Sequence, residues 1–146
     1  MPKSPWKELK KEISFPKLNK DLEVDIAIVG GGLAGISTAY SLISSGKKIA
    51  LIEKKEIGSG ATEYTTAMVT QVIDTSLSDL TKMFGEEKTK LVWRAGCEAI
   101  DRLENIIATE KIDCDFMRCP GYCYAQKPDQ LPGLRQDYET ATKLDF

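Results

Sequence analysis

Short apolar runs and a helical stripe alternate along the first part of the chain. The run Val24–Val29 is rich in β-branched residues, ends at three glycines and predicts a buried strand. Apolar residues at helical spacing follow and predict a helix that ends at Gly46. The run Lys48–Glu53 is apolar up to its final carboxylate and predicts a second strand. A strand, a helix and a strand within about 30 residues predict a βαβ unit with parallel strands.

The rest of the chain is mostly helical by pattern. Residues 54–76 have no periodicity, are rich in Gly, Ser and Thr, and predict a long loop. A short helix is predicted from Leu77 to a stop at Gly85, and Glu86 to about Glu110 keeps the apolar stripe of a longer helix. Residues 112–126 carry aromatic side chains around Pro-Gly and predict a hairpin. A last helix is predicted to reach Phe146.

Length and charge limit the classes of function. With 146 residues and 42% hydrophobic residues, the chain has the size and core of one ordinary domain. A net charge of −2 argues against a nucleic-acid partner. No run approaches the roughly 18 apolar residues that a membrane span needs. The N-terminus lacks the apolar segment of a secretory signal, so we expect a cytoplasmic protein.

The sequence contains no histidine and four cysteines. Without histidine there is no Ser-His-Asp or Cys-His nucleophile in the chain, so any chemistry is expected to come from a cofactor. Cys114, Cys119 and Cys123 follow C-x4-C-x3-C, which departs from the usual spacings of zinc and iron–sulfur sites. Reduced thiols in or near a core are the favoured interpretation, a metal site is the weaker alternative, and we assign no metal ligand.

The glycines after the first predicted strand carry the candidate chemistry. Residues 30–35 satisfy G-x-G-x-x-G between a strand and a helix, the context in which this pattern indicates dinucleotide binding. Gly30 allows the tight turn, Gly32 removes a side chain where a pyrophosphate approaches, and Gly35 allows close packing of helix and strand. The helix N-terminus presents free N–H groups and about half a positive charge to the phosphates.

Glu53 is the second part of the signal. It ends the second strand 18 positions after Gly35, near the spacing of about 20 at which a carboxylate binds ribose hydroxyls. A carboxylate there would repel a 2′-phosphate, which disfavours NADP. FAD and NAD both use this fingerprint, although the small residues and hydroxyls of residues 58–62 and 65–67 suit a long dinucleotide. The alternative for the motif is a glycine-rich turn with a solvated glutamate. The alternative for the loop after Glu53 is a flexible surface linker.

The run Val24–Thr70 resembles the N-terminus of FAD-dependent oxidoreductases of the D-amino-acid oxidase and glycine oxidase type. It is most similar to the subgroup that often carries a C-terminal Rieske domain. Further similarity lies in Ser4-Pro5-Trp6, Phe15-Pro16, Phe84–Lys88 and Ile112–Phe116. Tyr64 stands where relatives often have histidine or arginine. Family members are more than twice as long, so the chain resembles an N-terminal piece that stops inside the substrate domain.

The resemblance implies FAD as the cofactor and assigns residues to it. The glycine turn would hold the pyrophosphate, with Leu33 and Ala34 in backbone contact, and Glu53 and Lys54 would meet the adenosine ribose. The flavin side would be lined by Ala61, Thr62, Thr66, Ala67 and Met68. The full predicted cofactor set is Gly30, Gly31, Gly32, Leu33, Ala34, Gly35, Glu53, Lys54, Gly60, Ala61, Thr62, Thr65, Thr66, Ala67 and Met68. No catalytic residue is assigned.

The expected fold is therefore α/β, a Rossmann-type βαβ core with a helical insertion and the start of a substrate-domain hairpin. The expected organisation is a leader (1–22), the FAD-binding unit with its cofactor loop (23–76), a helical segment (77–111) and an incomplete substrate domain (112–146). The expected function is the FAD-binding part of an oxidoreductase that oxidises amines or amino acids by hydride transfer to flavin. The alternatives are a stand-alone dinucleotide-binding module, or a non-catalytic remnant that needs a separately encoded remainder.

Overall fold

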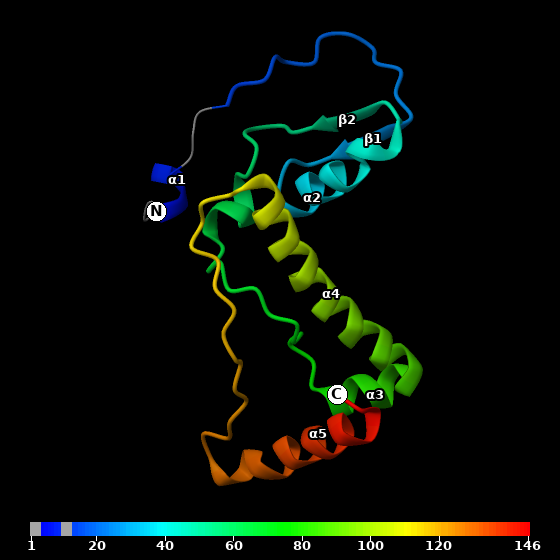
Figure 1. Ribbon diagram of the computed structural model, residues 1–146, viewed down its shortest axis with the longest axis vertical. Coiled ribbons are helices and arrows are strands. Elements are labelled where there is room, and N and C mark those ends of the chain that lie inside the picture. Colours follow the sequence, from blue (N-terminus) through cyan, green and yellow to red (C-terminus); the bar gives the residue numbers. More distant parts are fainter. Residues whose placement is uncertain (1–3, 10–12) are drawn as a thin grey trace. The chain divides into compact units, whose positions relative to one another are not determined.

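The computed structural model describes residues 4–9 and 13–146 (Figure 1). The chain divides into two compact units, Met1–Met68 and Val69–Phe146. None of the helices in the described ranges is long and apolar enough to cross a membrane.

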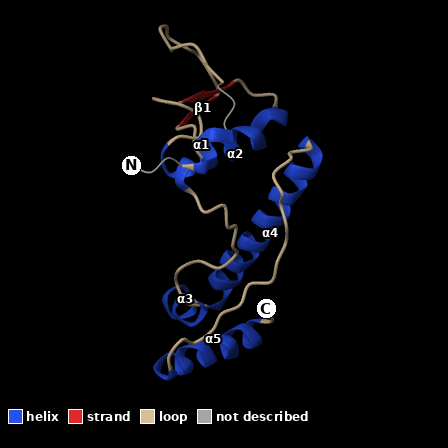
Figure 2. Ribbon diagram, turned by 90° about the vertical axis from the view of Figure 1, so that its left-hand side faces the viewer, coloured by secondary structure: helices blue, strands red, loops and turns tan. Residues whose placement is uncertain are grey.

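The first unit is built on two parallel strands and the helix between them. Its elements are α1 (Pro5–Leu9), β1 (Ile26–Val29), α2 (Leu33–Leu42), a 3-10 turn η1 (Ile43–Ser45), β2 (Ile49–Ile52) and a 3-10 turn η2 (Gly60–Tyr64). Ile26 pairs with Ile49, and the register continues to Val29 opposite Ile52. Helix α2 contacts both strands, which lie on one side of it (Figure 2). The predicted parallel βαβ arrangement is confirmed.

Both strands are shorter than the apolar runs that predicted them, and polar contacts lie directly before the first paired residues, Ile26 and Ile49. The carbonyl of Lys48 accepts hydrogen bonds from the backbone N–H groups of Asp25 (3.0 Å) and Ile26 (3.2 Å). The backbone N–H of Lys48 donates to the Asp25 carboxylate at 2.8 Å. This local network replaces regular pairing before Ile26. Helix α2 ends through η1 at Gly46, whose φ of 72° is left-handed, as the sequence predicted.

The second unit is helical. Its elements are α3 (Leu77–Phe84), α4 (Glu86–Glu110), a 3-10 turn η3 (Pro128–Gln130) and α5 (Leu131–Leu144). Helix α3 contacts both α4 and α5 (Figure 1). The three predicted helices are confirmed, with Gly85 as the residue between α3 and α4. Leu80 and Leu144, 7% and 2% exposed, are the buried hydrophobic residues of the described part of the chain.

The predicted hairpin over residues 112–126 is wrong. The structure forms neither strand nor helix from Ile112 to Gln126. Tyr122 and Tyr124, the aromatic residues that suggested a half-buried strand pair, are 82% and 72% exposed. An isolated two-stranded hairpin is marginal in water without a third strand or a helix to pack against. Without that cover, the aromatic residues on either side of the Pro-Gly turn have nothing to pack against, and pairing is not stabilised.

Two segments predicted without regular structure contain short helical turns. Residues 54–76 include η2, and the leader includes α1. Helix α1 contacts η2, so the leader packs against the loop that was predicted to hold the cofactor. The predicted boundary of the cofactor-binding unit at residue 76 stays a prediction.

Candidate functional site

The glycine turn between β1 and α2 requires glycine at two positions for different reasons. Gly30 has a φ of 105°, which L side chains rarely adopt, and its N–H donates to the carbonyl of Ile52 at 2.8 Å. A Cβ added at Gly35 would lie 1.9 Å from the carbonyl oxygen of Gly30. The first turn of α2 therefore rests directly on the backbone of the loop, as the predicted role of Gly35 requires.

The middle glycines lie against the two side chains that were predicted to bind ribose and flavin. A Cβ at Gly31 would lie 2.4 Å from Ile57 Cδ1 and 3.2 Å from Glu53 Cβ. A Cβ at Gly32 would lie 3.2 Å from the hydroxyl oxygen of Thr62. The turn is thus packed from one side by the end of β2 and from the other by η2.

The carboxylate of Glu53 is held by backbone N–H groups. Gly31 donates to Oε2 at 2.7 Å, and Lys55 donates to Oε1 at 2.9 Å. These bonds, that of Gly31 first, lower the pKa of Glu53 below its ordinary value of 4.5. The group is therefore ionised at neutral pH. Two oxygens offer about four lone-pair positions, so acceptor capacity remains for hydroxyl groups of a ligand.

The side chain of Thr62, from η2, contacts the N-terminus of α2. Its hydroxyl oxygen accepts a hydrogen bond from the backbone N–H of Leu33 at 3.0 Å. Gly32, the N-cap residue, has no side chain to make this bond, and the first turn of α2 holds no acidic residue. The first N–H groups of a helix lack partners within the helix, so an oxygen from outside is needed there. A phosphate oxygen would meet the same donors.

The structure brings only part of the predicted set together. Gly30, Gly31, Gly32, Leu33, Gly35, Glu53 and Thr62 converge on one place through the contacts described above. Gly60 and Ala61 lie in η2 beside Thr62, Lys54 follows Glu53, and Ala34 is exposed in the first turn of α2. Thr65, Thr66, Ala67 and Met68 follow η2 and are exposed, with Met68 at 78%. The flavin-side role of these last residues stays a prediction.

Several residues of this region were missed by sequence reasoning. The N–H of Gly58 donates to the carbonyl of Gly31 at 2.8 Å and ties the cofactor loop to the glycine turn. A cavity of about 560 Å³ lies next to Glu53 and is bounded by Lys55, Tyr64 and the leader residue Lys7. The only sequence feature that pointed to the leader around Lys7 was its similarity to one subgroup of the family. That similarity did not predict which residues the leader contacts.

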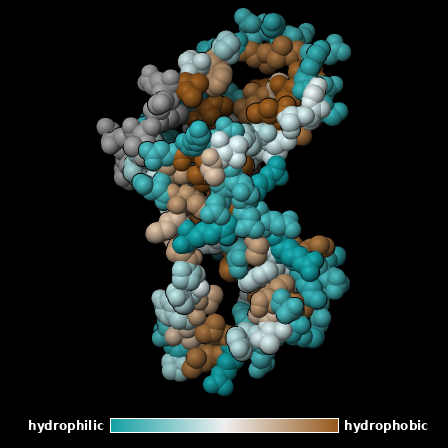
Figure 3. All heavy atoms as spheres, viewed as in Figure 1, coloured by the Kyte–Doolittle hydropathy of each residue, from teal (hydrophilic) through white to brown (hydrophobic). Residues whose placement is uncertain are grey.

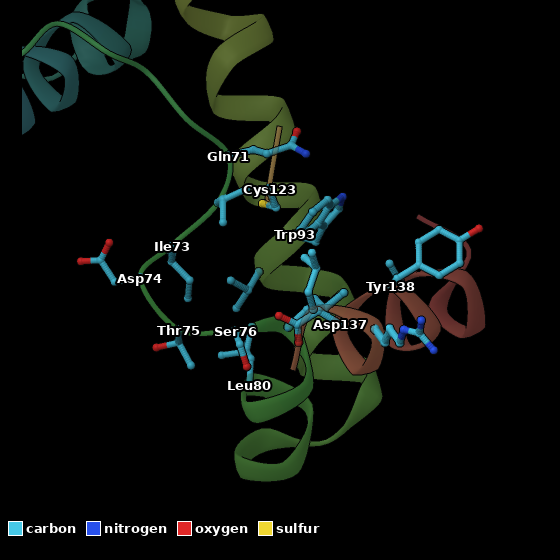
Figure 4. A pocket seen from close by; sticks show the side chains of 16 residues that line it. Gln71, Ile73, Asp74, Thr75, Ser76, Leu80, Trp93, Cys123, Asp137 and Tyr138 are labelled. Carbon is cyan, nitrogen blue, oxygen red and sulfur yellow. The ribbon is translucent and has the colours of Figure 1, made fainter. Parts of the chain in front are cut away.

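A second cavity lies wholly within the second unit (Figure 4). Its volume is about 650 Å³, and its walls are mainly apolar, including Leu80, Trp93 and Leu134. The ring of Trp93 also stacks on Phe146 with centroids 4.9 Å apart. Asp137 reaches the cavity, but its carboxylate accepts the backbone N–H of Ser78 at 2.9 Å. Asp137 therefore binds a backbone N–H in the first turn of α3. No sequence motif predicted this cavity.

The four cysteines lie in the second unit and are free thiols. Cys114, Cys119 and Cys123 lie in the irregular segment after α4 and are exposed free thiols. Cys97, in α4, is half-buried and donates to the side-chain carbonyl of Gln71 at 3.1 Å.

Comparison with known proteins identifies the family. The family described as "FAD dependent oxidoreductase" (DAO) matches residues 25–146. The match confirms the resemblance found in the sequence and indicates FAD as the cofactor of the family. A search of solved structures finds no match.

Three curated relatives resemble most of the chain. The putative Rieske 2Fe-2S iron-sulfur protein YhfW of Bacillus subtilis is 34% identical over 98% of this chain and 28% of its own length. The probable oxidoreductase OrdL of Haemophilus influenzae is 27% identical over 73% of this chain and 25% of its own length. The gamma-glutamylputrescine oxidoreductase of Escherichia coli is 26% identical over 86% of this chain and 29% of its own length. The chain thus spans about a quarter of the length of these relatives.

Proposed function

This chain belongs to the family of FAD-dependent oxidoreductases, and we propose that it is the FAD-binding N-terminal portion of an enzyme that oxidises amines or amino acids by hydride transfer to flavin. The single observation that carries the proposal is the convergence of Gly31, Glu53 and Thr62 on the start of α2. A carboxylate, a hydroxyl and a helix N-terminus are the groups that a ribose and a pyrophosphate need.

The residues present fit this cofactor. The amides that follow Leu33 offer donors to phosphate oxygens, and the Thr62 hydroxyl, which accepts the Leu33 N–H, keeps its own hydrogen to donate to such an oxygen. Glu53 is ionised and keeps acceptor positions for ribose hydroxyls. Bound flavin would supply the redox chemistry, because it accepts a hydride from the carbon next to the substrate nitrogen. The chain's own contribution is to bind and orient the dinucleotide.

The proposed substrate class rests on the relatives. One of them is named for gamma-glutamylputrescine, an amine. The chain spans about a quarter of the relatives' length, so we place the groups that position the substrate in the part of the protein that corresponds to their remaining length. The partners of the site are then a small amine or amino acid and the remainder of the enzyme.

A flavin titration tests the cofactor assignment. The purified chain should give a flavin absorption band after reconstitution and should quench FAD fluorescence at one equivalent, with NAD unable to compete. Glu53→Gln should weaken FAD binding on the order of tenfold, because one charge-assisted acceptor is lost. Glu87→Gln, an exposed change on α4, is the matched control and should bind as the parent does. Equal FAD affinity in all three proteins would contradict the assigned role of Glu53.

A second candidate is a stand-alone dinucleotide-binding module that acts with a separately encoded remainder, or a remnant without activity. It is favoured by the two-stranded sheet of the first unit, in which Val29 is 86% exposed. Anaerobic addition of amines to the FAD-loaded chain, alone and after co-expression with the remainder as a separate polypeptide, tests this candidate. Bleaching of the flavin band by the chain alone would contradict the need for a remainder. Bleaching only after co-expression of the remainder would support a module that acts with a separate chain.

A further inference from the structure

We propose that the leader segment Ser4–Lys7, called the strap below, positions η2 for cofactor binding and forms one wall of the adenosine side of the site. The inference rests on the proposed function, since it assigns residues outside the family's glycine motif to the same FAD site. It starts from the contact between α1 and η2, where two hydrogen bonds join residues that lie 59 positions apart in the sequence.

Three polar contacts join the strap to η2. The hydroxyl of Ser4, which is 5% exposed, donates to the carbonyl of Glu63 and accepts the backbone N–H of Trp6 at 3.2 Å. The indole N–H of Trp6 donates to the carbonyl of Thr65 at 2.8 Å. The ammonium of Lys7 lies 3.8 Å from the carboxylate of Glu63. The strap therefore donates to the backbone carbonyls of the two residues that flank Tyr64, Glu63 and Thr65.

These contacts fix the C-terminal end of η2, directly after Thr62. The strap holds the peptides of Glu63 and Thr65, immediately beyond Thr62, whose hydroxyl accepts the Leu33 N–H. Residues 54–76 are otherwise a long loop with little regular structure. Ordering such a loop on ligand binding costs entropy, and a loop already held in place costs less. The strap thus preorganises the hydroxyl at the phosphate end of the site.

The strap also bounds the site directly. Lys7 lines the cavity of about 560 Å³ that contains Glu53 and Tyr64. Glu53 is the predicted ribose ligand, so this is the adenosine side of the site. A dinucleotide lying there would have the strap on one side and the end of β2 on the other. Ser4, Trp6 and Lys7 are positioning residues in this arrangement.

Two conservative variants test the strap. Trp6→Phe keeps an aromatic ring but removes the indole donor, and Ser4→Ala removes the buried hydroxyl. Both should increase hydrogen exchange at residues 63–66 in the cofactor-free chain. Each should weaken FAD binding on the order of tenfold, and Ser4→Thr, which keeps the hydroxyl, should restore protection and affinity. Trp93→Phe, a matched change in the second unit, should leave both measurements unchanged.

Trp93→Phe adds a spectroscopic reading. Trp6 is then the only tryptophan of the chain, and FAD should quench its emission at one equivalent because the ring lies beside the cofactor loop. Unchanged exchange at residues 63–66 in Trp6→Phe and Ser4→Ala would overturn the strap. Changed exchange with unchanged FAD affinity would overturn its cofactor role. Failure of the parent chain to bind FAD would instead overturn the proposed function and that cofactor role together.

Discussion

At Gly35 a single methyl group decides whether α2 can rest on the glycine turn. An added Cβ would lie 1.9 Å from the carbonyl oxygen of Gly30, and backbone cannot move aside as a flexible side chain can. Gly35→Ala should therefore lower the free energy of unfolding by about 3 kcal/mol, the upper end for overpacking, and should abolish FAD binding. Denaturant unfolding and FAD titration measure the two effects.

The chain offers a matched control for this substitution. Gly133 lies in α5, and a Cβ added there would meet nothing within 4 Å. Gly133→Ala should be neutral or stabilise by up to about 1 kcal/mol, because alanine favours the helix. Loss of stability of the same size at both positions would show that the close approach at Gly35 is not the cause.

Glu53 predicts a pH dependence with a definite sign. The N–H groups of Gly31 and Lys55 lower the pKa of its carboxyl below 4.5 in the folded protein. The unfolded chain then binds the proton more readily, so Glu53 stabilises the fold above pH 4.5 and loses that effect as the pH falls through its folded pKa. Unfolding should be measured for the parent and Glu53→Gln from about pH 3 to 6. The difference in unfolding free energy between them should shrink toward low pH, and a constant difference would contradict the bond to Gly31.

At the scale of elements, α3 depends on the N-cap residue that precedes it. The hydroxyl of Ser76 accepts the backbone N–H of Asp79 at 3.1 Å, an N-cap bond. Ser76→Ala should cost about 1 kcal/mol of unfolding free energy and should increase hydrogen exchange across Leu77–Phe84. Ser76→Asp keeps an acceptor at the cap and should retain the parent's stability. An equal loss in Ser76→Ala and Ser76→Asp would show that the N-cap acceptor is not what stabilises α3.

Elements with a strong local signal could be predicted from the sequence, and contacts between distant segments could not. The apolar run, three glycines and helical stripe located β1, the turn and α2, because each signal is contained in neighbouring residues. The hairpin failed because aromatic residues around a Pro-Gly turn cannot supply the packing partner that a two-stranded hairpin needs. Thr62 was assigned to the flavin side, and its bond to Leu33 across 29 positions had no periodic signal. The contact between the strap and the η2 region could not be predicted for the same reason, because single hydrogen bonds between distant residues form it.

At the scale of the whole molecule, each unit leaves much apolar surface in contact with water. Apolar side chains gather on the visible surface of both units (Figure 3). Val29 is 86% exposed at the end of β1, and Leu33 is 65% exposed in α2. In the second unit, Met117 is 78% exposed. Apolar surface of this kind marks interaction sites or aggregation hazards, and the relatives carry about three quarters of their length beyond what this chain matches.

The last prediction follows from that surface. The 146-residue chain should bind the dye ANS, and co-expression with a polypeptide corresponding to the remaining length of a relative should reduce the dye signal and raise the unfolding temperature. Val29→Thr, which keeps the β-branched shape at the end of β1 with less apolar surface, should lower ANS binding of the chain alone. It should also weaken capture of the remainder, whereas Lys88→Gln, an exposed polar change on α4, should not. Weak dye binding by the chain alone, or capture that Val29→Thr leaves unchanged, would show that this strand end is not what the remainder covers.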